Sequence, residues 1–212
     1  MLAYNIKGAN QMIAVELEKN FGTNKPIFIS EIKALFPQYA SSYIYQLLRE
    51  AIKRGEIVRY DESVYFVPKI NMFGNAFISP DDIVYKKYIR NGDDVQGAFI
   101  GWTFLNGAGA TRQMPHVREI ATNKEKLRVR IVNFDGCRFI LRKPRVKINK
   151  KNQQLIALME TAAQFRLGEE SSEALVEFAR ENKIYSKDIL KYSGYYPAQT
   201  LKNLRGVLYG LA

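Results

Sequence analysis

The sequence has few of the residues on which disulfide-bonded, zinc-binding and many hydrolytic proteins depend. Its 212 residues include one cysteine, Cys137, and one histidine, His116. A single cysteine excludes an internal disulfide framework, and these two residues alone exclude a multi-cysteine or histidine-rich metal site. Because disulfides belong to oxidising compartments, we expect a reduced, cytoplasmic setting.

Long apolar runs are also missing. No apolar run approaches the roughly 18–20 residues that a membrane span requires, so we expect no membrane partner. The first residues, Met-Leu-Ala-Tyr-Asn, have neither a basic start nor an apolar core, so we expect no secretory signal. Apolar residues make up 47% of the chain and charged residues 25%, which is ordinary globular usage and excludes wholesale disorder.

No arrangement of residues indicates a catalytic site, and we expect a protein that is not an enzyme and needs no metal or cofactor. Cys137 and His116 lie far apart in sequence, which leaves a nucleophile pair unsupported. The acidic pairs at 81–82 and 93–94 fall at an expected helix start and in an expected turn, where acids occur for structural reasons. A nucleic-acid-processing enzyme, which would need clustered acids to hold a divalent metal, is the weakest alternative.

What the chain has in excess is positive charge, concentrated in its middle. The formal net charge is +11. Residues 69–150 hold 16 basic and 7 acidic residues, whereas residues 1–68 and 151–212 each hold 8 basic and 7 acidic ones. Such a field attracts a polyanion or an acidic protein. The alternative is a solvated basic face without a partner, although solvated faces usually mix both signs.

Residues 1–68 predict three helices followed by a β-hairpin. The expected elements are helices over 11–19 and 30–35, a longer helix ending at Arg54, and strands over 57–60 and 64–67. Ser30 is a good N-cap for the second helix, and Gly22 and Pro37 mark the ends of the first two. This order is typical of a winged helix-turn-helix, in which the third helix reads the major groove and the hairpin is the wing.

The third helix has one apolar and one polar edge. Ser41 or Ser42 is expected to cap it, and Gly55 follows its end. The apolar edge consists of Ile44, Leu47, Leu48 and Ala51, which recur at helical spacing. The polar edge consists of Ser42, Tyr45, Gln46, Arg49 and Lys53. We therefore expect the apolar edge to face a core and the polar edge to face solvent.

Residues 69–150 predict a linker, two helices and a small antiparallel sheet. The linker covers 69–77, the helices 79–90 and 98–106, and the strands 116–122, 126–132, 138–142 and 146–148. Ser79 is the expected N-cap of the first helix, and Asp135-Gly136 is a hairpin turn signal. Leu127, Val129 and Ile131 alternate with basic residues, which predicts an apolar face and an opposite basic face. The basic surface consists of Lys126, Arg128, Arg130, Arg138, Arg142, Lys143 and Arg145.

Residues 151–212 predict a helical region packed on the middle domain. Helical patterns cover 152–168, 171–181, 186–192 and 197–209, with Ser171 or Ser172 capping the second. The last two loosely repeat the pattern of residues 30–54, so a second nucleic-acid-binding element is an alternative. The expected fold class is α+β, with a winged helix-turn-helix (1–68), a small body with a basic antiparallel sheet (69–150) and C-terminal helices (151–212).

Three stretches, in a fixed order, carry a resemblance to a known family. Residues 48–67 are a helix end, Arg-Gly and a hairpin that includes Val-Tyr. Residues 97–123 run through Gln-Met-Pro to a strand ending in Ala-Thr-Asn, and residues 136–158 are a strand, Arg-Lys-Pro-Arg and a helix entry. Together they resemble AbiEi-type antitoxins, transcriptional regulators of type IV toxin–antitoxin systems in bacterial abortive infection. Ser63 stands where we expect glycine in the wing of that family.

The resemblance implies a winged helix that represses its own operon and a C-terminal domain that counters a nucleotidyltransferase toxin encoded alongside. From the residues themselves, we expect DNA contacts from Ser41, Ser42, Tyr45, Gln46, Arg49, Lys53, Arg59 and Tyr60. Gln46 and Arg49 are the expected base readers because both side chains make bidentate contacts.

Two questions stay open at this point. Since residues 1–68 carry a net charge of only +1, a homodimer or phosphate contacts from the basic sheet would have to supply part of the affinity for an operator. The alternative function is a protein- or RNA-interaction module that acts through the basic sheet, without sequence-specific DNA binding.

Overall fold

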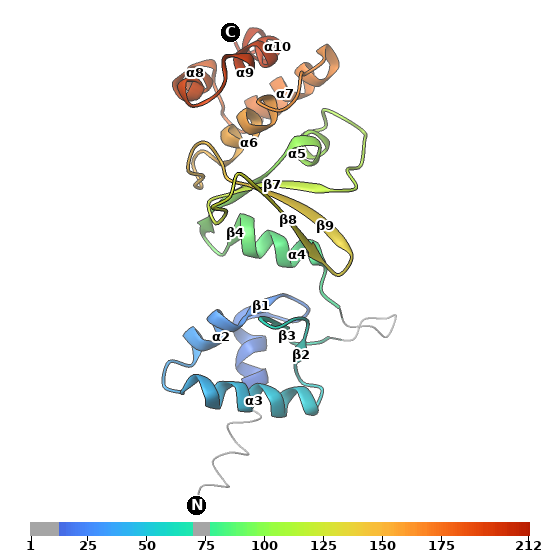
Figure 1. Cartoon of the computed structure of the whole chain (residues 1–212), viewed down its shortest axis with the longest axis vertical. Coiled ribbons are helices and arrows are strands. Elements are labelled where there is room, and N and C mark those ends of the chain that lie inside the picture. Colours follow the sequence, from blue (N-terminus) through green and yellow to red (C-terminus); the bar gives the residue numbers. More distant parts are fainter. Residues whose placement is uncertain (1–12, 70–76) are drawn as a thin grey trace, which may run out of the picture. The chain divides into compact units, whose positions relative to one another are not determined.

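The computed structural model describes residues 13–69 and 77–212, and it divides the chain into two compact units, Met1–Ile83 and Val84–Ala212 (Figure 1). Each unit has hydrophobic core clusters of its own. The linker predicted over 69–77 lies almost entirely outside the described residues. Among the residues described, no helix is long and apolar enough to span a membrane.

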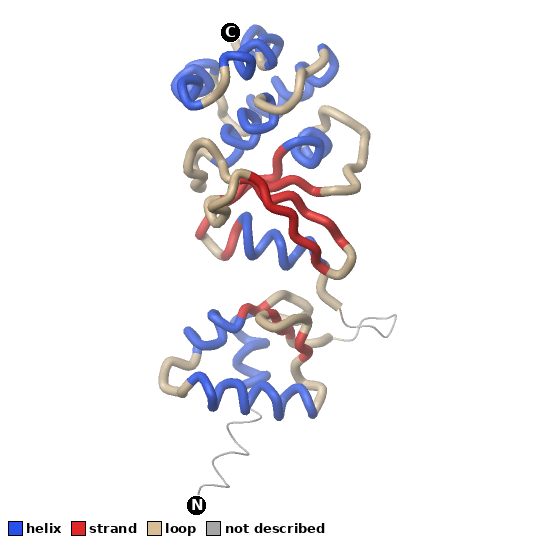
Figure 2. The backbone as a smooth tube through the Cα atoms, viewed as in Figure 1, coloured by secondary structure: helices blue, strands red, loops and turns tan. Residues whose placement is uncertain are grey.

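Over residues 13–69, which the structure describes, the N-terminal unit consists of three helices and three short strands (Figure 2). The elements are a helix over residues 13–21, β1 (Ile27–Phe28), α2 (Ile29–Leu35), α3 (Ser41–Lys53), β2 (Val58–Arg59) and β3 (Val64–Phe66). The strands form an antiparallel sheet in the order β1-β3-β2, with Tyr65 of β3 opposite both Ile27 and Arg59. The sequence predicted the helices and the hairpin, but strand β1 was not among the predicted strands.

The core of this unit lies under α3. Its predicted apolar edge, Ile44, Leu47, Leu48 and Ala51, is buried to 2% exposure or less, which confirms the helical periodicity. These side chains belong to one cluster with residues of the first helix and of β3. Burying one Leu or Ile side chain contributes about 1.5–3 kcal/mol, so this edge fixes α3 against the unit.

The glycines predicted to follow the first and third helices end those helices, and an aspartate shapes the hairpin turn. Gly22 and Gly55 adopt φ values of +79° and +73° just beyond the first and third helices, where a left-handed residue ends a helix. In the hairpin turn, the backbone N–H of Ser63 donates to Asp61 Oδ1 over 2.7 Å. This side-chain bond shapes the turn without a glycine at position 63.

The serine caps predicted for the second and third helices are wrong. The N-cap of α2 is Phe28, whose backbone N–H donates to the Glu31 carboxylate over 2.8 Å. Ser30 is therefore already inside the helix. α3 begins at Ser41, so Ser41 and Ser42 are its first helical residues rather than its cap. Their hydroxyls stay available at an exposed helix end.

The C-terminal unit is a sheet with helices on both faces (Figure 1). Its elements, with the helix that leads into it, are α4 (Pro80–Val84), the π-helical turn η1 (Tyr85–Ile89), β4 (Arg90–Asn91), β5 (Asp94–Val95), β6 (Gly97–Ile100), α5 (Gly101–Gly107), β7 (Arg118–Thr122), β8 (Val129–Phe134), β9 (Cys137–Arg142), α6 (Gln153–Ala162), α7 (Glu169–Glu181), α8 (Ser186–Tyr192), the 3-10 turn η2 (Ser193–Tyr195), α9 (Ala198–Asn203) and α10 (Arg205–Gly210). The Ser79 hydroxyl accepts the backbone N–H of Asp81 over 3.1 Å, which confirms the predicted cap of α4.

The main sheet is mixed, whereas the sequence predicted a purely antiparallel sheet. Its strand order is β6-β7-β9-β8, and β7 and β9 run parallel, because the chain passes from β7 to the far edge before β9 returns between them. Ile120, Phe139 and Leu141 on one face pack against η1. Ala98 and Ile100 on the other face join the core formed with α5 and α6.

The helix predicted over 98–106 is wrong in its first part, which forms β6. Gly101 has a φ of +64°, and the chain changes from strand to helix at this residue. Gly97 lies so close to the neighbouring backbone that a Cβ there would collide with the carbonyl oxygen of Tyr88. The predicted strand at 146–148 is also wrong, because the Asn123 side chain holds both backbone groups of Ile148 in an irregular segment.

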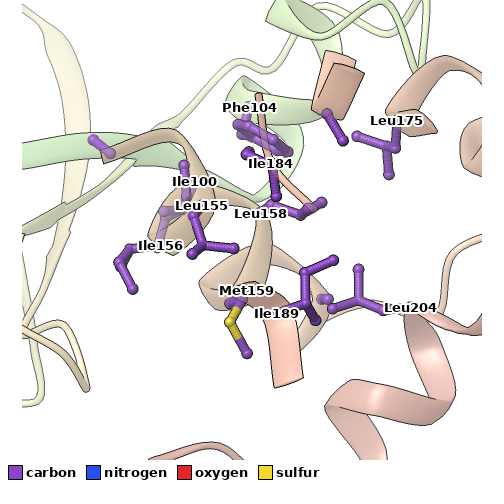
Figure 3. Close-up of a cluster of buried hydrophobic side chains, with 14 of the residues drawn as sticks. Ile100, Phe104, Leu155, Ile156, Leu158, Met159, Leu175, Ile184, Ile189 and Leu204 are labelled. Carbon is purple, nitrogen blue, oxygen red and sulfur yellow. The ribbon is translucent and has the colours of Figure 1, made fainter. Parts of the chain in front are cut away.

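The helices after residue 151 pack against the sheet and complete its core. Figure 3 shows Leu158 and Met159 of α6 surrounded by side chains from other elements, including Phe104, Ile189 and Leu204. The structure thus gives two compact units rather than three. The predicted helix over 197–209 is broken at Leu204 into α9 and α10, and α7 begins at Glu169, before the predicted serine caps Ser171 and Ser172.

Candidate nucleic-acid interface

The polar edge of α3 is the first part of the candidate interface. It lies on the helix surface opposite the buried stripe, and all six of its predicted DNA-contacting side chains are exposed: Ser41, Ser42, Tyr45, Gln46, Arg49 and Lys53. Within the described part of the chain, Arg49 forms no ion pair and Gln46 no side-chain hydrogen bond. Both side chains can therefore reach a ligand without breaking an internal contact.

Two other residues of this edge, Tyr45 and Lys53, contact neighbouring side chains. Lys33 Nζ of α2 lies 4.9 Å from the centre of the Tyr45 ring, within the range of a cation–π contact. Lys53 Nζ lies 3.0 Å from Glu50 Oε1, but both side chains are largely exposed, so water screens this pair and leaves it readily exchanged. The edge is thus partly ordered before any ligand arrives.

The β2–β3 hairpin supplies the second part of the interface. Arg59 is exposed on β2, and its Nε donates to the carbonyl oxygen of Asp61 over 2.9 Å, while Tyr60 is half-buried. Burial raises the pKa of the Tyr65 hydroxyl on β3, and the nearby charge of Arg59 partly opposes this rise. Tyr45 of α3 also raises the pKa of the same hydroxyl, and Arg59 of β2 lies opposite Tyr65 in the sheet.

The sequence predicted that the basic residues of the C-terminal unit share one face of the sheet, but they lie on both faces. Directly opposite residues in an antiparallel pair lie on the same face, and β8 places Val129 opposite Arg142 and Asn133 opposite Arg138. Arg138 and Arg142 therefore lie beside the apolar Val129, whereas Arg130 lies on the other face. The predicted separation of apolar and basic faces is wrong for β8.

The apolar residues expected to be buried in this segment are instead exposed. Leu127, Val129 and Ile131 are exposed to 59%, 41% and 48%, whereas Val132 and Phe134 pack against the core. The cause is the register, because Val132 lies opposite Phe139, whose side chain is fully buried. Periodicity within β8 could not reveal this, since both sets of alternating positions contain apolar residues.

Three of the predicted surface cations are bound to carboxylates. Arg130 pairs with Glu125 over 2.7 Å, Arg142 with Glu119 over 2.9 Å and Arg145 with Glu160 over 2.6 Å. All three glutamates are at most 13% exposed. These arginines therefore serve the fold, whereas Lys126, Arg128, Arg138 and Lys143 are exposed.

Glu125 shows how strongly such a pair can be held. Burial alone would raise the pKa of its carboxyl, but hydrogen bonds from Arg130 and from the backbone N–H groups of Leu127 and Lys126 outweigh burial, and the pKa is lowered. No sequence pattern indicates this arrangement, because a glutamate in a loop looks the same whether it is buried or exposed.

A second basic surface was missed by sequence reasoning. A cavity of about 550 Å³ beside the start of α6 is lined by four lysines together with amide side chains. The lysines are Lys150, Lys151, Lys183 and Lys191. Lys150 and Lys151 lie 32 residues or more before Lys183 and Lys191 in sequence, so only the packing of α7 and α8 on α6 brings the two pairs together.

Comparison of the chain with protein-family models gives no match, and comparison with curated proteins gives none either. The family resemblance in the sequence therefore stays an expectation. In the residues that the structure describes, no cluster of three metal-binding side chains occurs.

Proposed function

We propose that this protein is a DNA-binding transcriptional regulator whose N-terminal unit places α3 in the major groove of duplex DNA. The observation that carries the proposal is a 13-residue helix with a buried apolar edge and an exposed edge that bears Gln46 and Arg49. The major groove admits an α-helix, and a helix fixed on one side can present its other side to base edges.

The order of elements in this unit also supports the proposal. Helix, β1, α2, α3, β2 and β3 follow one another, and β3 lies between β1 and β2. This is the order found in winged helix-turn-helix domains, in which the hairpin lies beside the recognition helix. The proximity of Tyr45 and Arg59 to Tyr65 agrees with such an arrangement.

Each exposed group has a role that its chemistry suits. Gln46 can bind an adenine and Arg49 a guanine through two hydrogen bonds each. Ser41 and Ser42 lie in the first turn of α3, where hydroxyls and free backbone N–H groups can hold a phosphate. Lys53, with Arg59 on the hairpin, would contact phosphate and sugar, whereas the Tyr60 hydroxyl is buried and does not face solvent. Two copies on a palindromic operator would double these contacts and offset the low charge of the unit.

The antitoxin role is part of the proposal and depends on the resemblance. Autorepression of a toxin–antitoxin operon would use the interface on α3, and countering a nucleotidyltransferase toxin would use the C-terminal unit. Co-expression with the product of the adjacent gene tests this role. Growth that this chain restores supports it, whereas growth arrest that persists with the chain present contradicts it.

The DNA-binding role is tested by a mobility shift on the DNA upstream of the coding sequence, with a scrambled duplex as competitor. We expect a specific complex, and Arg49→Ala should weaken it by about 1–3 kcal/mol, or roughly 5- to 150-fold, and relax base preference. Lys19→Ala is the matched control, because it removes one exposed positive charge outside α3 and the hairpin. Unchanged binding by Arg49→Ala, or equal losses in both variants, would contradict the proposed recognition edge.

A further inference from the structure

Strand β8 is an edge strand of the main sheet, whose order is β6-β7-β9-β8. One of its edges pairs with β9, and no strand of the described chain lies along the other (Figure 1). The strand is six residues long and continues into a tight turn at Asp135 and Gly136, with φ values of +47° and +77°. An edge of this length presents an unpaired row of backbone donors and acceptors, to which another chain can add.

The register shows which backbone groups face outward. The Lys143 N–H donates to the carbonyl oxygen of Arg128 over 3.4 Å, so the backbone of Arg128 points toward β9. In an antiparallel ladder this direction alternates, and Arg130 and Val132 also point toward β9. The N–H and C=O groups of Val129, Ile131 and Asn133 therefore point away from the sheet, where an added strand would pair with them. That list contains two of the exposed apolar residues.

Over residues 127–131, apolar and basic side chains alternate between the two faces of this edge. Val129 and Ile131 on one face are 41% and 48% exposed, and Leu127 just before them is 59% exposed. The hydrogen bond from Lys143 to Arg128 continues the β8–β9 ladder by one residue, so Arg128 lies on the opposite face together with Arg130, whose guanidinium is held by Glu125. A strand that adds here would meet the branched apolar side chains of Val129 and Ile131 on one of its faces and the exposed Arg128 on the other.

We propose that β8 is the docking edge for an acidic segment of another protein, which binds as an added β-strand. Its apolar side chains would cover Val129 and Ile131, and its alternate carboxylates would face Arg128. Residues 124–150 hold ten basic and two acidic residues, so the field around the edge favours an acidic partner. Backbone pairing would supply affinity, and the alternating faces would supply selectivity.

Two other occupants fit this edge less well. A second copy of β8 would bring Arg128 and Arg130 close to their own equivalents, and like charges across a strand pair are destabilising. A nucleic acid would match the charge, but it has no backbone ladder to pair with Val129 and Ile131 and would leave their side chains uncovered. The apolar exposure and the outward backbone groups together favour a polypeptide.

The first experiment measures binding of a labelled nine-residue peptide of alternating Glu and Val to the full-length chain by fluorescence anisotropy. Ile131→Glu should weaken binding by about tenfold or more, because it removes an apolar contact and adds a repelling charge. Leu190→Glu is the control, since Leu190 is a comparably exposed apolar residue on α8, 54% exposed. No binding of the peptide, or equal weakening by both variants, would overturn the proposal.

The second experiment separates strand addition from charge attraction. The same peptide, N-methylated at alternate residues, keeps its charge but cannot donate to a neighbouring strand, so its binding should be lost. In hydrogen exchange, the amides of Val129, Ile131 and Asn133 should exchange more slowly in the complex, while those of Arg130 and Val132 stay unchanged. Equal binding of the methylated peptide, or displacement of the unmodified peptide by a single-stranded RNA with the same sensitivity to Ile131→Glu, would overturn the proposal.

The oligomeric state completes the test. Sedimentation should show that Ile131→Glu leaves the mass of the full chain unchanged, whereas a dimer that this variant dissociates would assign the edge to a second copy and overturn the proposal. The inference is independent of the DNA-binding proposal. Arg49→Ala should leave peptide binding unchanged, and Ile131→Glu should leave operator binding unchanged.

Discussion

Replacing Arg145 with alanine should destabilise the C-terminal unit although Arg145 lies at its surface. Its partner Glu160 is only 2% exposed and accepts three hydrogen bonds: from the Arg145 backbone N–H over 2.8 Å, from its guanidinium over 2.6 Å and from the Tyr196 hydroxyl over 3.2 Å. The guanidinium also lies 5.4 Å from the centre of the Tyr196 ring. Truncation removes the only one of these groups that carries a positive charge.

The expected loss follows from the geometry. Breaking a fully buried pair costs about 3–5 kcal/mol, because a charge is left uncompensated. The Arg145 side chain is 35% exposed, and Glu160 keeps its other two donors, so we expect about 2 kcal/mol. At roughly 3–5 °C per kcal/mol for a unit of this size, the midpoint of thermal unfolding should fall by about 6–10 °C.

Urea unfolding followed by fluorescence measures this effect. The chain has one tryptophan, Trp102, and it lies on α5 in the C-terminal unit, so its emission reports that unit alone. Lys147→Ala is the control, because Lys147 is an exposed cation in the same segment and should change stability by less than about 0.5 kcal/mol. A loss for Arg145→Ala no larger than that of Lys147→Ala would refute the reasoning.

Three further predictions concern stability. Gly97→Ala should lower the free energy of unfolding in urea by more than about 3 kcal/mol, because its Cβ would meet the Tyr88 carbonyl oxygen. Gly107→Ala is the control and should be neutral or stabilising, because no described atom lies within 4 Å of its Cβ. Similar losses in the two variants would contradict this prediction. Because the pKa of Glu125 is lowered in the folded state, its carboxylate stabilises the fold above the ordinary pKa of 4.5, and this stabilisation is lost as pH falls through the folded pKa. In Glu125→Gln, the free energy of unfolding should therefore decrease less steeply below about pH 4.5. An unchanged pH dependence would count against this prediction. Leu48→Ala, which empties a site that is 1% exposed, should cost the N-terminal unit about 2–5 kcal/mol by circular dichroism, and a loss below 1 kcal/mol would be inconsistent with its burial.

Local signals in the sequence were sufficient for much of the secondary structure. The apolar periodicity of α3 identified its buried edge, and the helix predicted over 186–192 has the bounds of α8, Ser186–Tyr192. Asp135-Gly136 forms the predicted hairpin turn, in which both residues have positive φ. These features depend on residues within one turn or one hairpin, so the sequence alone determines them.

The features that the sequence could not predict depend on contacts between distant segments. The register of β8 against β9 decides that Ile131 is exposed, and both alternating sets in that strand are apolar enough to be buried. Likewise, Arg145 counted as a surface cation because its partner Glu160 lies 15 residues away on a helix. Charge counts overestimate a basic surface wherever buried glutamates hold part of it.

The most direct test of the central claim is a crosslink from α3 to DNA. Gln46 would be replaced by a photoreactive benzoylphenylalanine in the full-length chain, bound to the duplex upstream of its coding sequence and irradiated. We expect a crosslink at a fixed base position that excess unlabelled duplex abolishes, and none when the same group replaces the exposed Lys19. Crosslinks from position 128 of the basic segment, with none from position 46, would contradict it.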